Sequence, residues 1–99
     1  MGGDLDFYRQ VLNEYLKENQ STADMLSFTI LEKRYADAAF IVHKVKSSSA
    51  TIGAKSLYDA AKTLQKNLFE EKEDKILPQA EMLSGLLTKL LREIQEFLS

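Results

Sequence analysis

The segment ILPQAEMLSGLLTKLLREIQEFL, residues 76–98, decides the fold of this 99-residue chain. Its apolar residues recur every three or four positions, which is the spacing of one face of an α-helix. The residues on this stripe are Ile76, Ala80, Leu83, Leu86, Leu87, Leu90, Leu91, Ile94 and Leu98. An apolar stripe of this length has to be buried against other elements. The segment therefore predicts one long helix whose inner face packs on neighbouring helices.

The rest of the chain also predicts helices. Glycine and proline are scarce, and no stretch alternates apolar and polar residues over the length of a strand. Helical spacing predicts four further helices, at residues 4–19, 22–32, 35–52 and 54–71. Because the connections between them are short, sequential helices should lie antiparallel. We expect an all-α fold, an antiparallel up-down four-helix bundle with an additional N-terminal helix.

A few residues mark the expected ends of these helices. Ser21 is suited to begin a helix as its cap, and Gly53 to end one in the left-handed conformation. Residues 70–75 are charged and polar, which indicates a solvated turn. Asp74 is suited to cap the last helix, with Pro78 in its first turn.

Length and composition restrict the function classes. A chain of this length forms one small domain, with residues 1–3 interpreted as a cloning remnant or disordered start and residues 4–99 as the domain. No cysteine is present, which excludes a disulfide framework and thiolate metal sites. A net charge of −2 gives no reason to expect nucleic-acid binding, and no apolar run reaches the length of a membrane span. We expect a cytoplasmic monomer without nucleic-acid or direct membrane contacts.

The only histidine, His43, lies within AAFIVHKVKSSSATIGA, residues 38–54. Successive residues of a helix are about 100° apart. One sector of the resulting wheel is apolar or small and should face the core: Ala38, Ile41, Val45, Ser48 and Ile52. The opposite side holds His43, Lys46, Ser47 and Ala50, with Ala39 beside them. His43 is therefore predicted to project outward from the middle of a helix.

Several roles for His43 fit the sequence poorly. A metal site needs more ligands, but no second histidine exists and no Asp or Glu lies three or four positions away. A Ser-His-Asp triad would need a strained turn and an oxyanion hole, whereas Ser47, Ser48 and Ser49 lie within a predicted helix. An incidental surface histidine and a nucleophilic histidine both stay open at this point.

The surroundings of His43 favour a nucleophile. Ala39, Ser47 and Ala50 are small, so the imidazole stands clear and another protein can approach it. A neutral imidazole is a competent nucleophile near neutral pH. Lys46, one turn further along, would attract a phosphoryl group. These residues indicate a histidine that accepts a phosphoryl group and passes it to a partner.

The segment HKVKSSSATIGAKSL, residues 43–57, resembles the signature of histidine-containing phosphotransfer (HPt) domains. That signature runs His-x-x-Lys-Gly, then small residues, then an apolar residue followed by Gly and Ala, then Leu. The matching residues are His43, Lys46, Ile52, Gly53, Ala54 and Leu57. The chain length, the helical layout and a histidine on the second of four bundle helices extend the resemblance over nearly the whole chain.

The resemblance implies a function. HPt domains relay phosphoryl groups between the aspartates of receiver domains, without a nucleotide site or a kinase activity of their own. The phosphorylated histidine corresponds to His43 and the phosphate-side lysine to Lys46. Many members carry a glutamine that reaches the imidazole, and Gln65 stands at the corresponding position. Such domains are often the C-terminal module of a membrane-bound hybrid sensor kinase, and sometimes free-standing.

The expected partners are therefore the receiver domains of response regulators. No cofactor is expected in the chain itself, because its carboxylates are not clustered and the divalent cation should come from the receiver. Receiver docking is expected at Ala39, Phe40, Lys44, Ser47 and Ala50. Residues of the 22–32 helix would add apolar contacts, and the lysines would steer the encounter.

One residue departs from the signature, because Ser47 stands where glycine usually follows the lysine. Serine is still small and can hydrogen-bond a phosphoryl group, so the departure bears on the approach of the receiver and not on the class. Three alternatives stay open. They are a helical adaptor with an incidental histidine, a nucleic-acid-binding helical domain, and the phosphohistidine domain of a chemotaxis-type kinase.

Overall fold

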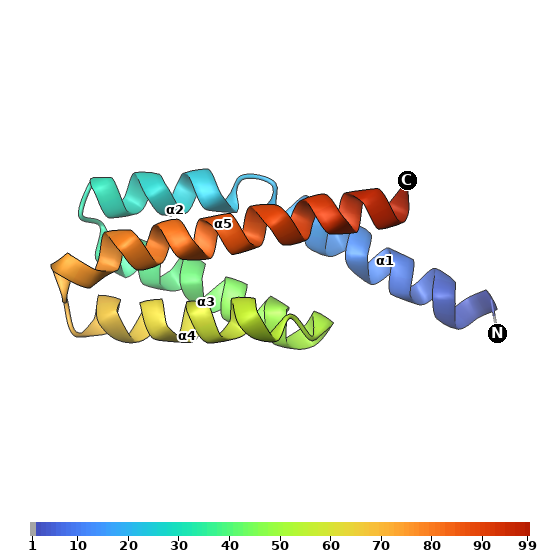
Figure 1. Cartoon of the computed structure of the whole chain (residues 1–99), viewed down its shortest axis with the longest axis horizontal. Coiled ribbons are helices and arrows are strands. Elements are labelled where there is room, and N and C mark those ends of the chain that lie inside the picture. Colours follow the sequence, from blue (N-terminus) through green and yellow to red (C-terminus); the bar gives the residue numbers. More distant parts are fainter. Residues whose placement is uncertain (1) are drawn as a thin grey trace.

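The computed structural model describes residues 2–99, which form five α-helices (Figure 1). They are α1 (Gly2–Asn19), α2 (Thr22–Leu31), α3 (Tyr35–Ile52), α4 (Lys55–Phe69) and α5 (Glu73–Leu98). Helices α2 to α5 lie side by side, each antiparallel to the next, and α5 also packs against α2 to close the bundle. Helix α1 precedes this bundle and slopes away from it at the end where both termini lie. The predicted all-α bundle with an additional N-terminal helix is confirmed.

The first helix begins within residues 1–3, the segment that was predicted to precede the domain. Met1 lies outside the described residues, and α1 begins at Gly2. The division into residues 1–3 and a domain at 4–99 stays a prediction. Within residues 2–99, no helix combines the length and apolar character that a membrane crossing requires.

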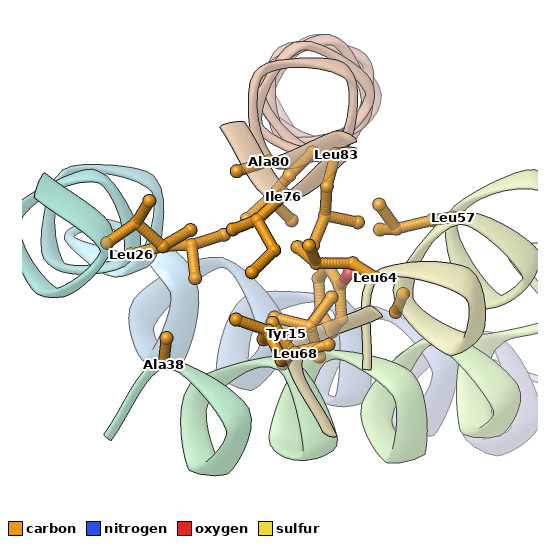
Figure 2. Packing of buried hydrophobic residues seen from close by; sticks show 14 of the residues in the cluster. Tyr15, Leu26, Ala38, Leu57, Leu64, Leu68, Ile76, Ala80 and Leu83 are labelled. Carbon is orange, nitrogen blue, oxygen red and sulfur yellow. The ribbon is translucent and has the colours of Figure 1, made fainter. Parts of the chain in front are cut away.

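The core runs along the axis of the four-helix bundle. Figure 2 shows Leu26 of α2, Leu64 of α4 and Leu83 of α5 pointing toward one another, and all three are almost completely buried. The stripe that predicted α5 supplies five buried residues, Ile76, Ala80, Leu83, Leu87 and Ile94. Burying one leucine or isoleucine side chain of this stripe contributes about 1.5–3 kcal/mol. Packing of these faces, rather than helix propensity, therefore holds the helices in place.

The inner face of α3 is rotated from the predicted one. Its buried residues are Ala38, Val42, Val45 and Ser49. Ile41, Ser48 and Ile52, which the wheel placed in the core, are only half-buried. The wheel locates the apolar side of one isolated helix. In the bundle α3 is covered by α4 on one side and by α1 and α2 on another, so its buried sector is the one between these neighbours.

Burial in the first two helices is also less than their spacing predicts. Leu5 and Tyr8 are exposed because the first half of α1 slopes away from the bundle (Figure 1), where Tyr8 meets the Phe97 ring of α5 edge-on. In α2, Leu26, Thr29 and Ile30 are buried, whereas Met25 and Leu31 are exposed. A short helix at the rim of a bundle buries only a narrow stripe.

Three helices end in the same backbone conformation. Gly53 follows α3 with φ of 77°, as predicted, and the Ala54 N–H then donates to the Ser49 carbonyl across 2.9 Å. Lys33 after α2 and Glu71 after α4 adopt the same left-handed region, with φ of 57° and 54°. In this conformation the backbone N–H groups that follow the helix donate to carbonyls of its last turn, which would otherwise have no partner. At the two non-glycine positions the conformation costs about 1–2 kcal/mol.

The starts of α2 and α5 differ in detail from the predicted caps. Ser21 occupies the cap position of α2, but its side chain makes no capping hydrogen bond. Lys72, not Asp74, occupies the cap position of α5, so Asp74 lies inside the first turn. There its carboxylate still interacts favourably with the positive end of the helix dipole. Pro78 is the sixth residue of α5 and lies beyond its first turn.

Tyr15 of α1 places a phenol in the core beside α3. Burial raises the pKa of this phenol, and the nearby Ser49 and Ser48 hydroxyls partly oppose the increase. A tyrosine of the unfolded chain titrates near pH 10. Above about pH 10 the unfolded state therefore loses this proton more readily than the folded state, and the free energy of unfolding falls as the pH rises.

We predict that Tyr15→Phe makes the protein less sensitive to alkali, because the variant lacks this titration. Urea unfolding of both proteins at about pH 8 and about pH 11 measures the effect. The free energy of unfolding should fall less between the two pH values in Tyr15→Phe than in the wild type. Comparing the two falls removes any constant difference in stability. Equal falls would contradict the placement of the phenol in the core.

Candidate functional site

His43 lies in the middle of α3, the second helix of the bundle, and its side chain is exposed. The predicted outward direction of His43 is confirmed. Val42, directly before it, and Val45, two residues after it, are buried at 0% and 1% exposure. These valines fix the backbone on both sides of the histidine against the core. The imidazole is thus presented to solvent by a helix that cannot easily rotate.

Gln65 of α4 reaches toward α3 and contacts two of its side chains. The amide oxygen, Oε1, accepts a hydrogen bond of 2.9 Å from Lys46 Nζ. The amide nitrogen, Nε2, lies 3.5 Å from His43 Nδ1. The three residues singled out as the reactive group in the sequence are therefore neighbours in space.

Two features of this group could not be seen on the wheel. Lys46 is half-buried rather than fully exposed, and so is Gln65. Both lie along the contact between α3 and α4, the most extensive helix contact of the described residues. Gln65 follows Leu64, which is fully buried and anchors this part of α4. The position of the amide is therefore set by the core.

A groove of about 470 Å³ lies on the other side of His43. Its walls come from α3 and from the junction of α1 and α2, including Glu18 and Thr22. Three of the residues expected to dock a receiver line this groove: Phe40, Lys44 and Ser47. The other two do not line it. Ala39 is half-buried and packs against the core, and Ala50 is exposed two turns along α3 from His43, on the same side of the helix but beyond the groove.

Apolar side chains extend the groove along α2. A second hollow adjoins it, because Met25, Phe40 and Ile41 line both. Phe28 lines the second hollow only. Met25, Phe28 and Phe40 are 55%, 56% and 66% exposed, which is high for large apolar residues. We call these three residues the apolar surface.

Sequence reasoning identified only part of the apolar surface. Phe40 was expected there, and the contribution of the 22–32 helix was expected without named residues. In the 22–32 segment, Met25, Leu26, Ile30 and Leu31 recur at helical spacing, whereas Phe28 falls off this stripe, which was a usable signal. Met25 fitted the stripe and so carried no such signal. Its exposure follows from the way α2 is rotated on α3 and α5.

Two lysines of α3, Lys44 and Lys46, place positive charge beside His43. Lys44 is exposed, and its Nζ lies 5.7 Å from the centre of the Phe40 ring. Lys46 lies one turn along the helix from His43. An exposed imidazole flanked by two ammonium groups is suited to meet a phosphoryl group, because the charges oppose those of the phosphoryl oxygens.

Comparison with known proteins identifies the family to which this chain belongs. The family model described as the Hpt domain matches residues 10–97, from the middle of α1 to the end of α5. No curated protein and no solved structure matches the chain. The matched range covers nearly the whole chain and includes all of the groups described around His43. The chain therefore belongs to the Hpt domain family, whose members act in histidine phosphotransfer within phosphorelays.

Proposed function

We propose that His43 accepts a phosphoryl group from the aspartate of one receiver domain and passes it to the aspartate of another. The observation that carries the proposal is the position of His43. It is the only histidine of a chain that belongs to the Hpt family, and it is exposed between two ammonium groups and an apolar surface. Family membership alone supports phosphotransfer, and the geometry supports this residue as its carrier.

The chemistry needs little beyond positioning and charge. A ring nitrogen of His43 attacks phosphorus, the nitrogen–phosphorus bond forms, and the phosphorus–oxygen bond to the receiver aspartate breaks. The electron pair of that bond leaves with the aspartate carboxylate. Transfer to the next receiver is the reverse reaction. Lys46 is assigned the role of balancing phosphoryl charge, because its ammonium is close enough to reach a group bound to the imidazole.

The partner is a receiver domain that docks over the groove and the apolar surface. Met25, Phe28 and Phe40 would cover an apolar patch of the receiver, which brings its aspartate to His43. Lys44 flanks this surface and would steer an acidic active site toward the imidazole. The divalent cation that phosphoaspartate chemistry requires is assigned to the receiver. We place the domain in the cytoplasm as a monomer, either free-standing or as the C-terminal module of a hybrid sensor kinase.

The direct test is His43→Gln. The variant should accept no phosphoryl group from phosphorylated receivers, because no other side chain of the chain is a histidine. Its helical circular dichroism and melting temperature should match the wild type, since the imidazole is exposed. Acid-labile phosphate on His43→Gln would contradict the assignment. A large loss of stability would show that the histidine has a structural role instead.

The apolar surface can be tested at Phe28, which does not line the groove at His43. Phe28→Ser should slow transfer from a receiver about fivefold to tenfold, because losing a large aromatic anchor of an interface costs about 1–1.4 kcal/mol. Phosphorylation by a small phosphoramidate should be unchanged, since no docking is needed.

The matched control is Met82→Ser, which removes an apolar side chain of similar exposure from α5. It should leave the transfer rate at the wild-type value. Equal transfer rates in Phe28→Ser and Met82→Ser would mean that the receiver docks on another face.

The approach to the imidazole can be tested at Ser47, which is exposed and lines the groove. Ser47→Gly should keep or raise the transfer rate, although glycine costs about 0.5 kcal/mol in a helix. Ser47→Trp should block transfer while the bundle stays folded, because the indole projects into the space that a receiver must occupy. Phosphotransfer rates and thermal unfolding of both variants provide the measurement. Normal transfer by Ser47→Trp would refute docking over the groove.

A further inference from the structure

The contact between Lys46 and Gln65 determines which end of the amide faces the histidine. A lysine ammonium has three donors and no acceptor, so only Oε1 of Gln65 can face it. The 2.9 Å hydrogen bond between Lys46 Nζ and Gln65 Oε1 satisfies this requirement. The NH₂ end of the amide must then point the other way, and it lies 3.5 Å from His43 Nδ1.

This orientation selects a tautomer of the imidazole. A neutral imidazole carries one N–H and one nitrogen with a free lone pair. Because Gln65 presents a donor to Nδ1, the favourable partner is an Nδ1 without a proton, and the proton then resides on Nε2. In that tautomer Nε2 has no lone pair for attack. Nδ1 has one, but the Gln65 amide lies against it.

We propose that the Lys46–Gln65 hydrogen bond holds unphosphorylated His43 in its Nε2–H tautomer, a resting form that does not attack phosphorus. The inference rests on the proposed function of His43 and adds a regulation of that site. Lys46 acts on the unphosphorylated imidazole as a positioning residue, through the Gln65 amide, in addition to its proposed role toward the phosphoryl group.

Arrival of a phosphorylated receiver would release the resting form. The phosphoryl oxygens compete with Gln65 for the Lys46 ammonium, because a charged acceptor binds an ammonium more strongly than a neutral amide does. Once Lys46 turns to the phosphoryl group, the Gln65 amide can rotate so that Oε1 faces Nδ1. Solvent water takes the proton from Nε2 and another water delivers one to Nδ1. The proton arrives at Nδ1 before the other leaves Nε2, so the imidazole passes briefly through its cation and ends the exchange neutral.

The transfer step is then balanced. The Nε2 lone pair forms the bond to phosphorus, and the phosphorus–oxygen bond breaks with its electron pair on the aspartate carboxylate. The product is a phosphoimidazolium whose proton stays on Nδ1 and donates to Gln65 Oε1. Lys46 pairs with the phosphoryl oxygens. The receiver that brings the phosphoryl group thereby also brings His43 into its reactive tautomer.

The tautomer can be observed directly by nitrogen-15 NMR of the unphosphorylated protein at alkaline pH, where a histidine side chain is neutral. Long-range proton–nitrogen correlations distinguish the protonated ring nitrogen from the unprotonated one by chemical shift. Gln65→Ala is the reference for the intrinsic preference of this imidazole. The wild type should show a larger share of Nε2–H than Gln65→Ala.

Two further variants test the role of each partner. Gln65→Glu should invert the assignment to Nδ1–H, because a carboxylate can accept from Lys46 and from Nδ1 together. Lys46→Met should lower the Nε2–H share toward the reference, since the amide is then free to rotate. Lys66→Met is the matched control. Lys66 follows Gln65 in the chain and is exposed, so this variant loses one positive charge and its spectrum should match that of the wild type.

Each outcome decides the proposal. A wild-type Nε2–H share equal to or below that of Gln65→Ala overturns it, and so does a Lys46→Met spectrum identical to that of the wild type. Circular dichroism of each variant verifies that the bundle is folded. The spectra need no phosphate and no receiver, so they stand or fall separately from the proposed function. Failure of His43 to accept phosphate would leave the tautomer result intact.

Discussion

The packing of α3 against α4 is the contact on which the rest of the site depends. Val42 and Val45 of α3 and Ala61 and Leu64 of α4 are buried to within 1%. A small residue at Ala61 allows the two helices to approach closely, and the branched residues prevent either helix from rotating. His43 follows Val42 and Gln65 follows Leu64, so the core that holds the helices also sets the distance between the imidazole and the amide.

The bundle surrounds His43 with two unlike environments. On the α4 side the neighbours are polar and closely spaced, with the Lys46–Gln65 hydrogen bond half-buried along the helix contact. On the α1–α2 side there is an open groove that continues into exposed apolar side chains. A single helix can serve both purposes because residues three or four positions apart share a face, whereas adjacent residues do not. If the proposed function is correct, phosphotransfer and receiver docking can therefore be altered separately by substitution.

The additional helix α1 contributes to both the core and the groove. Its second half places Leu12 and Tyr15 against the bundle, and Glu18 and Asn19 at the edge of the groove. Its first half slopes away from the bundle, where its apolar residues stay exposed (Figure 1). The family match begins at residue 10, which is close to the point where α1 meets the bundle. The packed half of α1 is thus the half that the family model includes.

Much of this protein was determined by its sequence alone. The apolar spacing specified five helices, and Gly53 specified one of their ends, because both signals are local to the chain. The outward direction of His43 also followed from local spacing, since the sector opposite it is apolar. His43 and Lys46 were predicted as site residues from their surroundings on one helix and from the resemblance to the HPt signature, and Gln65 from the resemblance alone. Predicting these three residues did not require knowing how far each side chain is buried.

The tertiary structure alone decided how the helices are rotated against one another. A helical wheel describes one isolated helix, whereas burial depends on which neighbouring helices cover it. Ser49 is therefore buried, although the wheel placed Ser48 in the core. Met25 is exposed for the same reason, and with it the apolar surface. The contact of Gln65 with both Lys46 and His43 spans two helices, and no pattern within either helix encodes its distance or the direction of the amide. These features depend on long-range packing, which is specified by the whole core and not by any one segment.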